Sequence, residues 1–169
     1  MKIVPKLDAG PVMMKNCVQI SERTNFTELS NKLSRLGSSM ILKSLHLIEQ
    51  NKAVFIDQNE NEATYAKKIE KKEAKISWNE KAKIILAKIN ALNPNPGTWL
   101  EYNKARIKIT KAVEIKKNGN PGEIISDKFI VGCLENSIQI LELQKEGKKS
   151  MNVSEYLRGN KVTIGSNVK

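Results

Sequence analysis

The stretch TWLEYNKARIKITKAVEI, residues 98–115, decides the fold of the C-terminal part of the chain. It holds two runs, TWLEY and ARIKITKAVEI, in which apolar and β-branched residues alternate with polar ones, and the turn signal YNK separates them. A period of two predicts strands with one buried face, so Ile107 and Ile109 are expected to point inward. The stretch therefore predicts two strands joined by a turn.

Three further runs of the same kind follow. They are GEIIS at residues 122–126, FIVGCLE at 129–135 and SIQILELQ at 137–144, and turn residues such as KNGNPG separate them. Five short strands at this spacing predict a small barrel. An OB-like closed sheet is the common solution for a compact β domain that faces nucleic acid.

Helices are expected on both sides of this barrel. One opens at Ser77 or Asn79, carries an isoleucine-rich apolar face and ends before two prolines. The segment NVSEYLRG predicts a two-turn helix capped by Asn152 or Ser154. The expected fold class is α+β, an OB-like β-barrel with flanking helices.

The N-terminal part has a different pattern. Residues 1–20 contain two short extended pieces hinged at LDAG, and residues 24–50 place apolar side chains near one face of a long helix. The segment QNKAVFIDQNENEA is polar and turn-rich and is interpreted as a linker. The predicted organisation is an N-terminal piece at 1–49, a linker at 50–63 and a C-terminal domain at 64–169.

The basic charge is concentrated after the predicted linker. The chain carries 29 Lys and Arg against 18 Asp and Glu, a net charge of +11, and residues 64–169 account for +10 of it. Such an excess favours a polyanion partner such as nucleic acid, because neutralising phosphates supplies affinity without sequence readout. The alternative is a solvated lysine-rich surface, and the lysines of residues 67–75 are interpreted in that way.

Six basic residues in two groups are the candidates for phosphate contacts. They are Lys145, Lys148 and Lys149, and Lys104, Arg106 and Lys108. The first group flanks a glycine in a predicted loop between the last strand and the last helix, where lysines and backbone N–H groups hold phosphates; an ordinary charged hairpin loop is the alternative. The second group alternates along one predicted strand and is expected to form a basic stripe on one face.

Several chemistries are not supported by the sequence. It contains no phosphate-binding glycine loop of the common types, no G-x-S-x-G motif and no His and Cys cluster for a metal. The single histidine, His46, is assigned a structural or surface role, and Cys17 and Cys133 are interpreted as buried small side chains in a reducing compartment. Without a signal peptide or a membrane-spanning run, a cytoplasmic protein with no membrane partner is expected.

Asp8 in the stretch LDAGPV is the one candidate catalytic residue. An aspartate before Ala-Gly is good turn chemistry, because its side chain bonds backbone N–H groups two residues on. The same carboxylate is also suited to acid–base work. The local sequence leaves both readings open.

Five stretches in order give the chain a family resemblance. LDAGPV, LSNKLSRLG, TYAKKIEKKEAKISW, INALNPNPGTW and LQKEGKKSMNVSEYLRG resemble the corresponding parts of methionyl-tRNA formyltransferases, from Ile3 to Gly159. L-D-x-G alone is shared with other folate-dependent formyltransferases and hydrolases. The lysine-rich stretch ending at Trp78 and the final stretch are similar to the tRNA-modifying branch.

The resemblance implies transfer of a formyl group from 10-formyltetrahydrofolate to the amino group of methionyl initiator tRNA. It implies that residues 1–49 are the strand-and-helix end of a Rossmann-like formyltransferase domain and that 64–169 form the OB-like tRNA-binding domain. Asp8 matches the family's catalytic aspartate, which acts with the asparagine and histidine of an I-N-x-H motif. These groups help the attacking amine to lose its proton and supply donors to the oxyanion of the tetrahedral intermediate.

The sequence departs from the family at two places. No I-N-x-H motif occurs in the 169 residues, so the chain is expected to bind no folate and to be inactive alone, with a separate N-terminal formyltransferase chain as one partner that would complete it. In INALNPNPGTW, Asn90, Leu92 and Asn95 stand where Arg, Phe and Trp are often found, which weakens an RNA role for this loop. Pro94, Pro96, Gly97 and Trp99 are therefore interpreted as turn and core residues. The alternatives are a stand-alone RNA-binding module or another folate-dependent formyltransferase.

Overall fold

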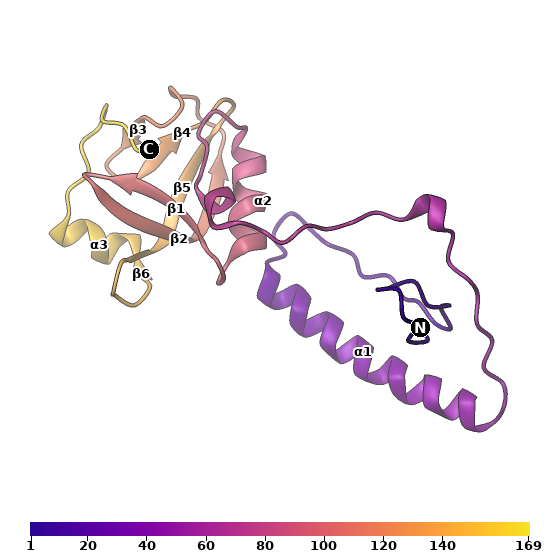
Figure 1. Cartoon of the computed structure of the whole chain (residues 1–169). Coiled ribbons are helices and arrows are strands. Elements are labelled where there is room, and N and C mark those ends of the chain that lie inside the picture. The colour runs from indigo at the N-terminus through magenta and orange to yellow at the C-terminus, as the bar shows by residue number, and fades with distance from the viewer. The chain divides into compact units, whose positions relative to one another are not determined.

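The computed structural model describes all 169 residues and separates them into two compact units. The first unit comprises residues 1–21 and 28–68, and the second comprises residues 22–27 and 69–169. Figure 1 shows one long helix in the first unit and all of the strands in the second. Asp8 therefore belongs to the first unit and the six basic candidates to the second.

Helix α1, Phe26–Glu49, dominates the first unit and confirms the predicted long helix. No residue of α1 is buried. Five of its large apolar side chains are about half exposed or more, namely Leu33, Ile41, Leu42, Leu45 and Ile48, whereas Leu29, Leu36, Met40 and Leu47 are partly buried. The helix is amphipathic, but the first unit supplies no core for its apolar face.

Residues 1–20, where the sequence predicts two extended pieces, contain no strand. Their one bridge joins Val12 to Ile56, where each backbone N–H donates to the other carbonyl at 2.8 and 3.0 Å. A strand needs a neighbour along its length to pair its backbone groups, and no strand runs beside these residues. Of the expected strand-and-helix remnant, the helix is present and the strand is reduced to a single bridge.

A six-stranded antiparallel sheet forms the second unit. Its strands are β1 Thr98–Tyr102, β2 Ala105–Ile115, β3 Ile124–Ser126, β4 Ile130–Gly132, β5 Ser137–Lys145 and β6 Met151–Asn152. The strand order is β1-β2-β5-β4-β3, and β6 pairs with β5. The five predicted strands are confirmed, whereas β6 is too short to produce an alternating pattern in the sequence.

The sheet is open, so the predicted closed, OB-like barrel is not confirmed. β1 and β3 end the strand order and do not pair with each other. The C-terminal tail lies between them: Lys169 exchanges two backbone hydrogen bonds with Glu101 of β1, and residues 165–168 bond to Gly122 and Ile124 at the start of β3. The backbone groups of Glu101 in β1 and Ile124 in β3 thus bond to the tail and not to each other.

One face of the sheet and helix α2, Ala82–Leu92, enclose the core. α2 buries four residues at helical spacing, Ala82, Ile85, Ile89 and Leu92, and packs on β1, β2 and β5. Ile107 and Ile109 of β2 are fully buried, which confirms their predicted inward orientation. The helix begins at Ala82 rather than near Ser77 or Asn79, because Lys75 bridges to Trp99 of β1, Ile76 and Trp78 are buried, and a turn at residues 78–80 comes before the helix.

Helix α3, Val153–Gly159, packs against β5 and β6. Asn152 is its N-cap, and the Asn152 side chain accepts a hydrogen bond from the N–H of Ser154. Tyr156 of α3 stacks on Phe129 with ring centroids 6.1 Å apart, and Phe129 also contacts Tyr102 at 5.9 Å. The aromatic cluster ties the short helix to the core.

The two cysteines lie in different surroundings. Cys133 is buried in the core, as expected, and burial raises the pKa of its thiol to about 12. Cys17 is exposed, so its predicted burial is wrong; the loop that carries it has no core to enter. None of the helices combines the length and the apolar character that crossing a membrane requires.

Candidate nucleic-acid interface

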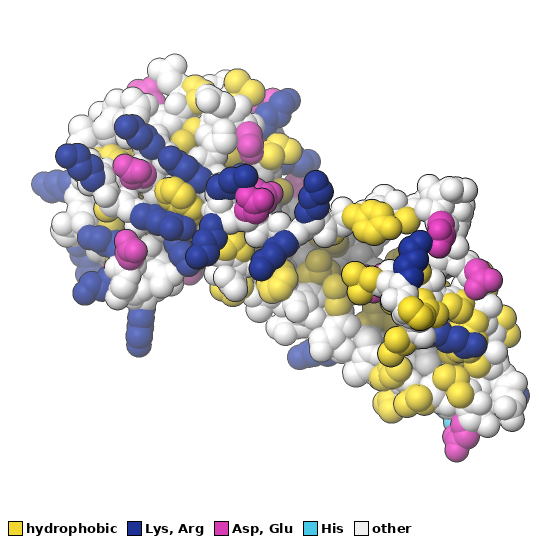
Figure 2. Space-filling view, viewed as in Figure 1, with side chains coloured by type: hydrophobic (Ala, Val, Ile, Leu, Met, Phe, Trp, Pro, Cys, Tyr) yellow, Lys and Arg dark blue, Asp and Glu magenta, His cyan; other side chains and the backbone are white.

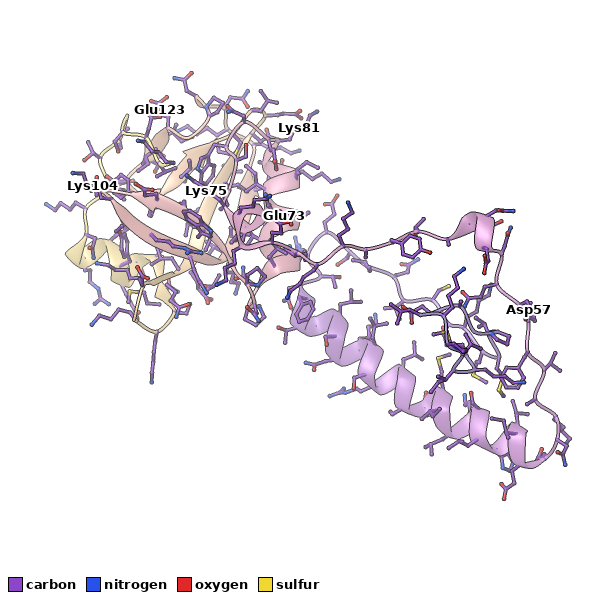
Figure 3. All side chains as sticks on the ribbon, viewed as in Figure 1. Asp57, Glu73, Lys75, Lys81, Lys104 and Glu123 are labelled. Carbon is purple, nitrogen blue, oxygen red and sulfur yellow. The ribbon has the colours of Figure 1, made fainter.

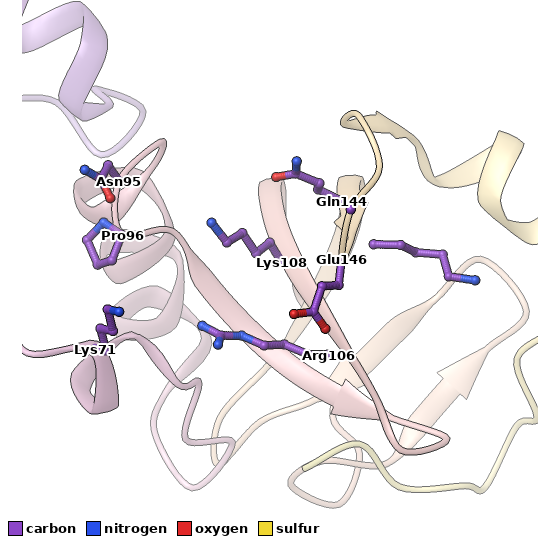
Figure 4. A pocket seen from close by; sticks show the side chains of 9 residues that line it. Lys71, Asn95, Pro96, Arg106, Lys108, Gln144 and Glu146 are labelled. Atoms are coloured by element: carbon purple, nitrogen blue, oxygen red, sulfur yellow. The ribbon is translucent and has the colours of Figure 1, made fainter.

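A groove about 410 Å³ in volume lies on the second unit and brings together several of the predicted basic residues. It is called the basic groove below, and its lining residues are Lys71, Asn95, Pro96, Arg106, Lys108, Gln144, Lys145, Glu146 and Gly147. Four of these side chains are cationic and one is a carboxylate. Figure 4 shows the charged ends of Arg106 and Lys108 pointing toward Lys71 and Asn95.

Side chains on one face of β2 line the basic groove, because successive residues of a strand point to opposite faces. Ile107 and Ile109 enter the core, so Arg106 and Lys108 point to the opposite face of the strand. Lys104 differs from the expected stripe: it lies in the β1–β2 turn with a φ of 62°, and it does not line the groove. Figure 3 shows Lys104 at the tip of that hairpin.

The end of β5 and the loop after it form another wall. Lys145 lines the basic groove, and its Nζ donates to Asn160 Oδ1 at 3.2 Å. Lys148 and Lys149 lie further along the same loop and do not line the groove. The loop is folded back on itself, because the N–H of Lys148 donates to the Lys145 carbonyl and the Gln144 amide donates to the Lys148 carbonyl.

Lys71 comes from a segment that the sequence interpretation assigned to a solvated surface. The lysines of residues 67–75 are exposed, which agrees with that interpretation, whereas Ala74 and Ile76 beside them are buried. The N–H of Ile76 donates to the Trp99 carbonyl at 3.0 Å, which fixes this segment along β1. The short 3-10 turn Lys71–Ala74 then presents Lys71 to the groove.

Two cationic side chains contact the ring of Trp99 beside the basic groove. The Arg106 guanidinium lies over the indole ring with its Cζ 4.2 Å from the centroid, and Lys75 Nζ lies 5.3 Å from it. A cation over an aromatic face is attracted by the ring quadrupole. Sequence reasoning assigned Trp99 to the core and missed this contact. Pairing of β1 with β2 creates it, since Trp99 lies opposite Lys108 and diagonal to Arg106.

The indole N–H of Trp99 is buried and has no hydrogen-bond partner. An unpaired buried donor costs about 1–3 kcal/mol relative to a paired one. Phenylalanine at this position would fill similar space without that cost. The face of the Trp99 ring carries two cations, and an indole binds cations best among the aromatic side chains.

Positive charge covers the second unit widely. In Figure 2, Lys and Arg side chains are more numerous than the acidic side chains that lie among them on the face of the second unit that is in view. In the basic groove, Glu146 is the one carboxylate among four cations, and Figure 4 shows it pointing toward the Arg106 side chain. The groove is therefore suited to an anionic ligand.

Asp8 lies in the N-terminal loop of the first unit and is exposed, with a φ of 54°. The loop is held by Gln58, whose side-chain amide donates to the carbonyls of Asp8 and Gly10 at 2.8 and 2.7 Å. His46 is exposed on α1, where it bonds to Gln50 at 2.7 Å, and it makes no contact with Asp8. No cluster of three or more His, Cys, Asp or Glu side chains suited to a metal is found.

A family of known proteins matches most of the second unit. The sequence model of the family described as formyl transferase, C-terminal domain, matches residues 68–161. The basic groove and Trp99 lie within the matched residues.

Curated proteins resemble almost the whole chain. The methionyl-tRNA formyltransferase of Pelagibacter ubique is 40% identical over 169 residues, which is 99% of this chain and 54% of that protein. The methionyl-tRNA formyltransferases of Bradyrhizobium diazoefficiens and Rickettsia felis are 35% and 37% identical, over 98% and 96% of this chain and 55% and 54% of theirs. The chain thus spans about half the length of the curated relatives it matches.

Solved structures share the fold at low identity. HypX from Aquifex aeolicus, in complex with tetrahydrofolic acid, matches with a TM-score of 0.72 and 16% identity, over 96% of this chain and 32% of that one. WlaRD, a sugar 3N-formyl transferase, matches with a TM-score of 0.62 and 20% identity, over 87% and 53%. At these identities the likeness concerns the fold alone.

Proposed function

The chain belongs to the formyl transferase family through its C-terminal domain, and from that membership we propose that it is the C-terminal half of a methionyl-tRNA formyltransferase. The observation that carries the proposal is 40% identity to the Pelagibacter ubique enzyme over 99% of the chain. The proposed reaction transfers a formyl group from 10-formyltetrahydrofolate to the amino group of methionyl initiator tRNA. Both molecules are substrates of the whole enzyme.

We assign Asp8 to the chemistry of that reaction. The attacking amine loses a proton as its nitrogen bonds to the formyl carbon, and the bond from that carbon to N10 of the folate then breaks as N10 takes up a proton. A carboxylate that stabilises a neighbouring protonated histidine assists this proton transfer. The asparagine and histidine of the family motif are absent from these 169 residues, so Asp8 acts only together with a part of the enzyme that supplies them. The isolated chain is expected to be catalytically inactive.

The basic groove is assigned to tRNA phosphates. Lys71, Arg106, Lys108 and Lys145 supply charge without reading bases, so they position the tRNA rather than select its sequence. Lys148 and Lys149 stay candidates as further contacts on the adjoining loop, and Lys104 stays a candidate at the hairpin tip. The initiator tRNA is then distinguished elsewhere in the complete enzyme.

We propose that the apolar face of α1 is covered by the rest of the formyltransferase domain. The relatives are nearly twice as long as this chain, and no residue of α1 is buried within the first unit. Burying apolar surface stabilises a helix by about 25 cal/mol per Å². The covering part belongs either to the same polypeptide or to a separate chain, and reading the DNA upstream of the Met1 codon in all three frames distinguishes the two.

The catalytic assignment is tested by Asp8→Ala in the complete, two-part enzyme. Formylation of methionyl-tRNA is expected to fall by at least about 10³-fold, with tRNA binding unchanged, because one member of a catalytic group is lost. Asp57→Ala, which removes a carboxylate from the same unit, serves as the control and should leave turnover intact. Unchanged turnover in Asp8→Ala would remove Asp8 from the mechanism.

The RNA-binding assignment is tested with this chain alone and an unmodified initiator tRNA transcript. The logarithm of the binding constant is expected to fall linearly with log[salt], by about 0.9 per phosphate contact if the duplex DNA value applies. Weak binding whose constant does not change with salt would mean that the lysines form only a solvated surface. Binding without any formyl transfer by the completed enzyme would favour the alternative, a stand-alone RNA-binding module.

Another folate-dependent formyltransferase is the remaining alternative. One structural neighbour, WlaRD, is described as a sugar 3N-formyl transferase. Offering the completed enzyme methionyl-tRNA and a nucleotide-linked amino sugar in separate reactions discriminates the two substrates. Preference for the sugar would exclude the tRNA assignment while leaving the formyl-transfer chemistry in place.

A further inference from the structure

We propose that Trp99 is a positioning residue for a phosphate-binding site in the basic groove. Its ring fixes the Arg106 guanidinium so that this side chain, with Lys71 and Lys108, binds one phosphodiester group of an RNA backbone. The proposal rests on the RNA-binding part of the proposed function and adds a residue that does not itself touch the ligand.

The first support is the placement of Arg106. An exposed arginine side chain samples many rotamers, and fixing them on binding costs free energy. The Arg106 Cζ lies 4.2 Å from the Trp99 centroid, so the ring already holds this side chain. Glu101 lies opposite Arg106 in the β1–β2 register but forms no ion pair with it. The guanidinium is thereby kept available for a ligand.

The second support is the accumulation of like charge around one ring. Lys75 lies 5.3 Å from the same centroid, and its neighbours Ala74 and Ile76 are buried, so the backbone fixes where Lys75 emerges. Lys71 and Lys108 line the groove next to Arg106. Cations held this close repel one another, and an anion between them relieves the repulsion.

The third support is the size of the groove. Its volume of about 410 Å³ is large enough for a phosphate with its flanking sugar, and it lies within the range of small ligand sites. Arginine presents its donors as a planar fork that matches two phosphate oxygens, whereas lysine is a point charge. Figure 4 shows the Arg106 fork directed toward Lys71, on the opposite side of the groove.

The test compares Trp99→Leu, Trp99→Phe and Arg106→Lys in the full 169-residue chain, with the initiator tRNA transcript as probe. Trp99→Leu is expected to weaken binding about tenfold and to reduce the salt slope by about one contact. Trp99→Phe, which keeps an aromatic face, should lose less than threefold. Arg106→Lys keeps the charge but not the fork, and should weaken binding about as much as Trp99→Leu.

A double-mutant cycle separates positioning from general structural damage. If Trp99 acts through Arg106, Trp99→Leu has little further effect in an Arg106→Gln background. Trp78→Phe is the control for Trp99→Phe, because Trp78 also has an unpaired indole N–H but is buried and carries no cation on its ring. It should bind RNA as the unsubstituted chain does.

The possible outcomes are distinct. Additive losses in the cycle, or a folded Trp99→Phe variant that binds as weakly as Trp99→Leu, would overturn the positioning role while leaving RNA binding in place. If Trp99→Leu fails to fold, Trp99→Phe and Arg106→Lys still decide the matter. Failure of the unsubstituted chain to bind the transcript would instead overturn the proposed function on which this inference rests.

Discussion

At the scale of single residues, the same residue type has different properties in the two units. Cys17 is exposed on a loop of the first unit, whereas Cys133 is buried in the second, where loss of solvent raises the pKa of its thiol to about 12. Lys145 is held by Asn160, and Arg106 by Trp99, while Lys104 extends from a turn. Chemical role follows from these surroundings rather than from residue type.

Native alkylation is expected to distinguish the two cysteines. The thiolate is the reactive form, and at pH 8 a thiol with a pKa of about 12 is almost entirely protonated as well as shielded. Iodoacetamide should therefore modify Cys17 alone in the folded chain and both cysteines in urea, as read by peptide mass spectrometry. Equal modification of Cys133 in the folded state would contradict its burial.

Glu146 is expected to limit RNA affinity, because its carboxylate lies among the cations of the basic groove. Glu146→Gln should raise affinity for the tRNA transcript by about two- to fivefold, the range of a single exposed charge interaction. Glu155→Gln on α3 changes the net charge equally and does not line the groove, so it is the control. The same gain in both variants would mean that only overall charge matters.

At the scale of elements, the C-terminal tail lies between the edge strands β1 and β3 and bonds to both. Val168 is buried, and the tail bonds to β1 through Lys169 and to the start of β3 through Gly122. Gly122 has a φ of +83°, and a Cβ there would meet the Val168 carbonyl oxygen at 3.0 Å. The position of the tail therefore depends on a glycine.

Gly122→Ala is expected to destabilise the chain by about 2–4 kcal/mol, from a left-handed backbone and displacement of the tail. Gly147→Ala shares the left-handed backbone, with a φ of +69°, but has open space around the added methyl group. It should cost about 1 kcal/mol. Urea unfolding followed by tryptophan fluorescence measures both; equal losses would show that the tail contact contributes nothing.

At the scale of the whole molecule, the two units differ in what stabilises them. The second contains a continuous core under the sheet, whereas α1 in the first buries no residue. Most helical stability in proteins comes from packing of an apolar face rather than from intrinsic propensity. The first unit therefore depends on a partner surface more than the second does.

Hydrogen exchange of the 169-residue chain is expected to show this difference. Amides of α2, with four buried residues, should exchange only on global unfolding, while those of the longer α1 should exchange many-fold faster. Mass spectrometry of peptides from both helices measures the rates in one sample. Uniform protection of α1 and α2 would contradict an uncovered apolar face. Adding the part of the formyltransferase domain that is proposed to cover α1 should slow exchange in α1 selectively.

The sequence by itself determined the local elements and the chemistry of the surface. Alternation in residues 98–115 predicts β1 and β2, and the apolar side chains near one helical face in residues 24–50 predict α1. Charge counting locates the basic half. Each of these depends on neighbours close in the chain. The resemblance carried by LDAGPV and the final stretch adds the family, and the relatives support it.

Only the tertiary structure decided how distant residues meet. The open sheet, the tail beside β1 and the assembly of Lys71, Arg106, Lys108 and Lys145 around one groove depend on strand pairing between segments far apart in the chain. Local patterns do not encode such pairing, since the period of a strand fixes its faces but not its neighbours. Trp99 shows this most clearly: its apolar ring indicates a core position, and its role beside Arg106 arises only from the register of β1 on β2.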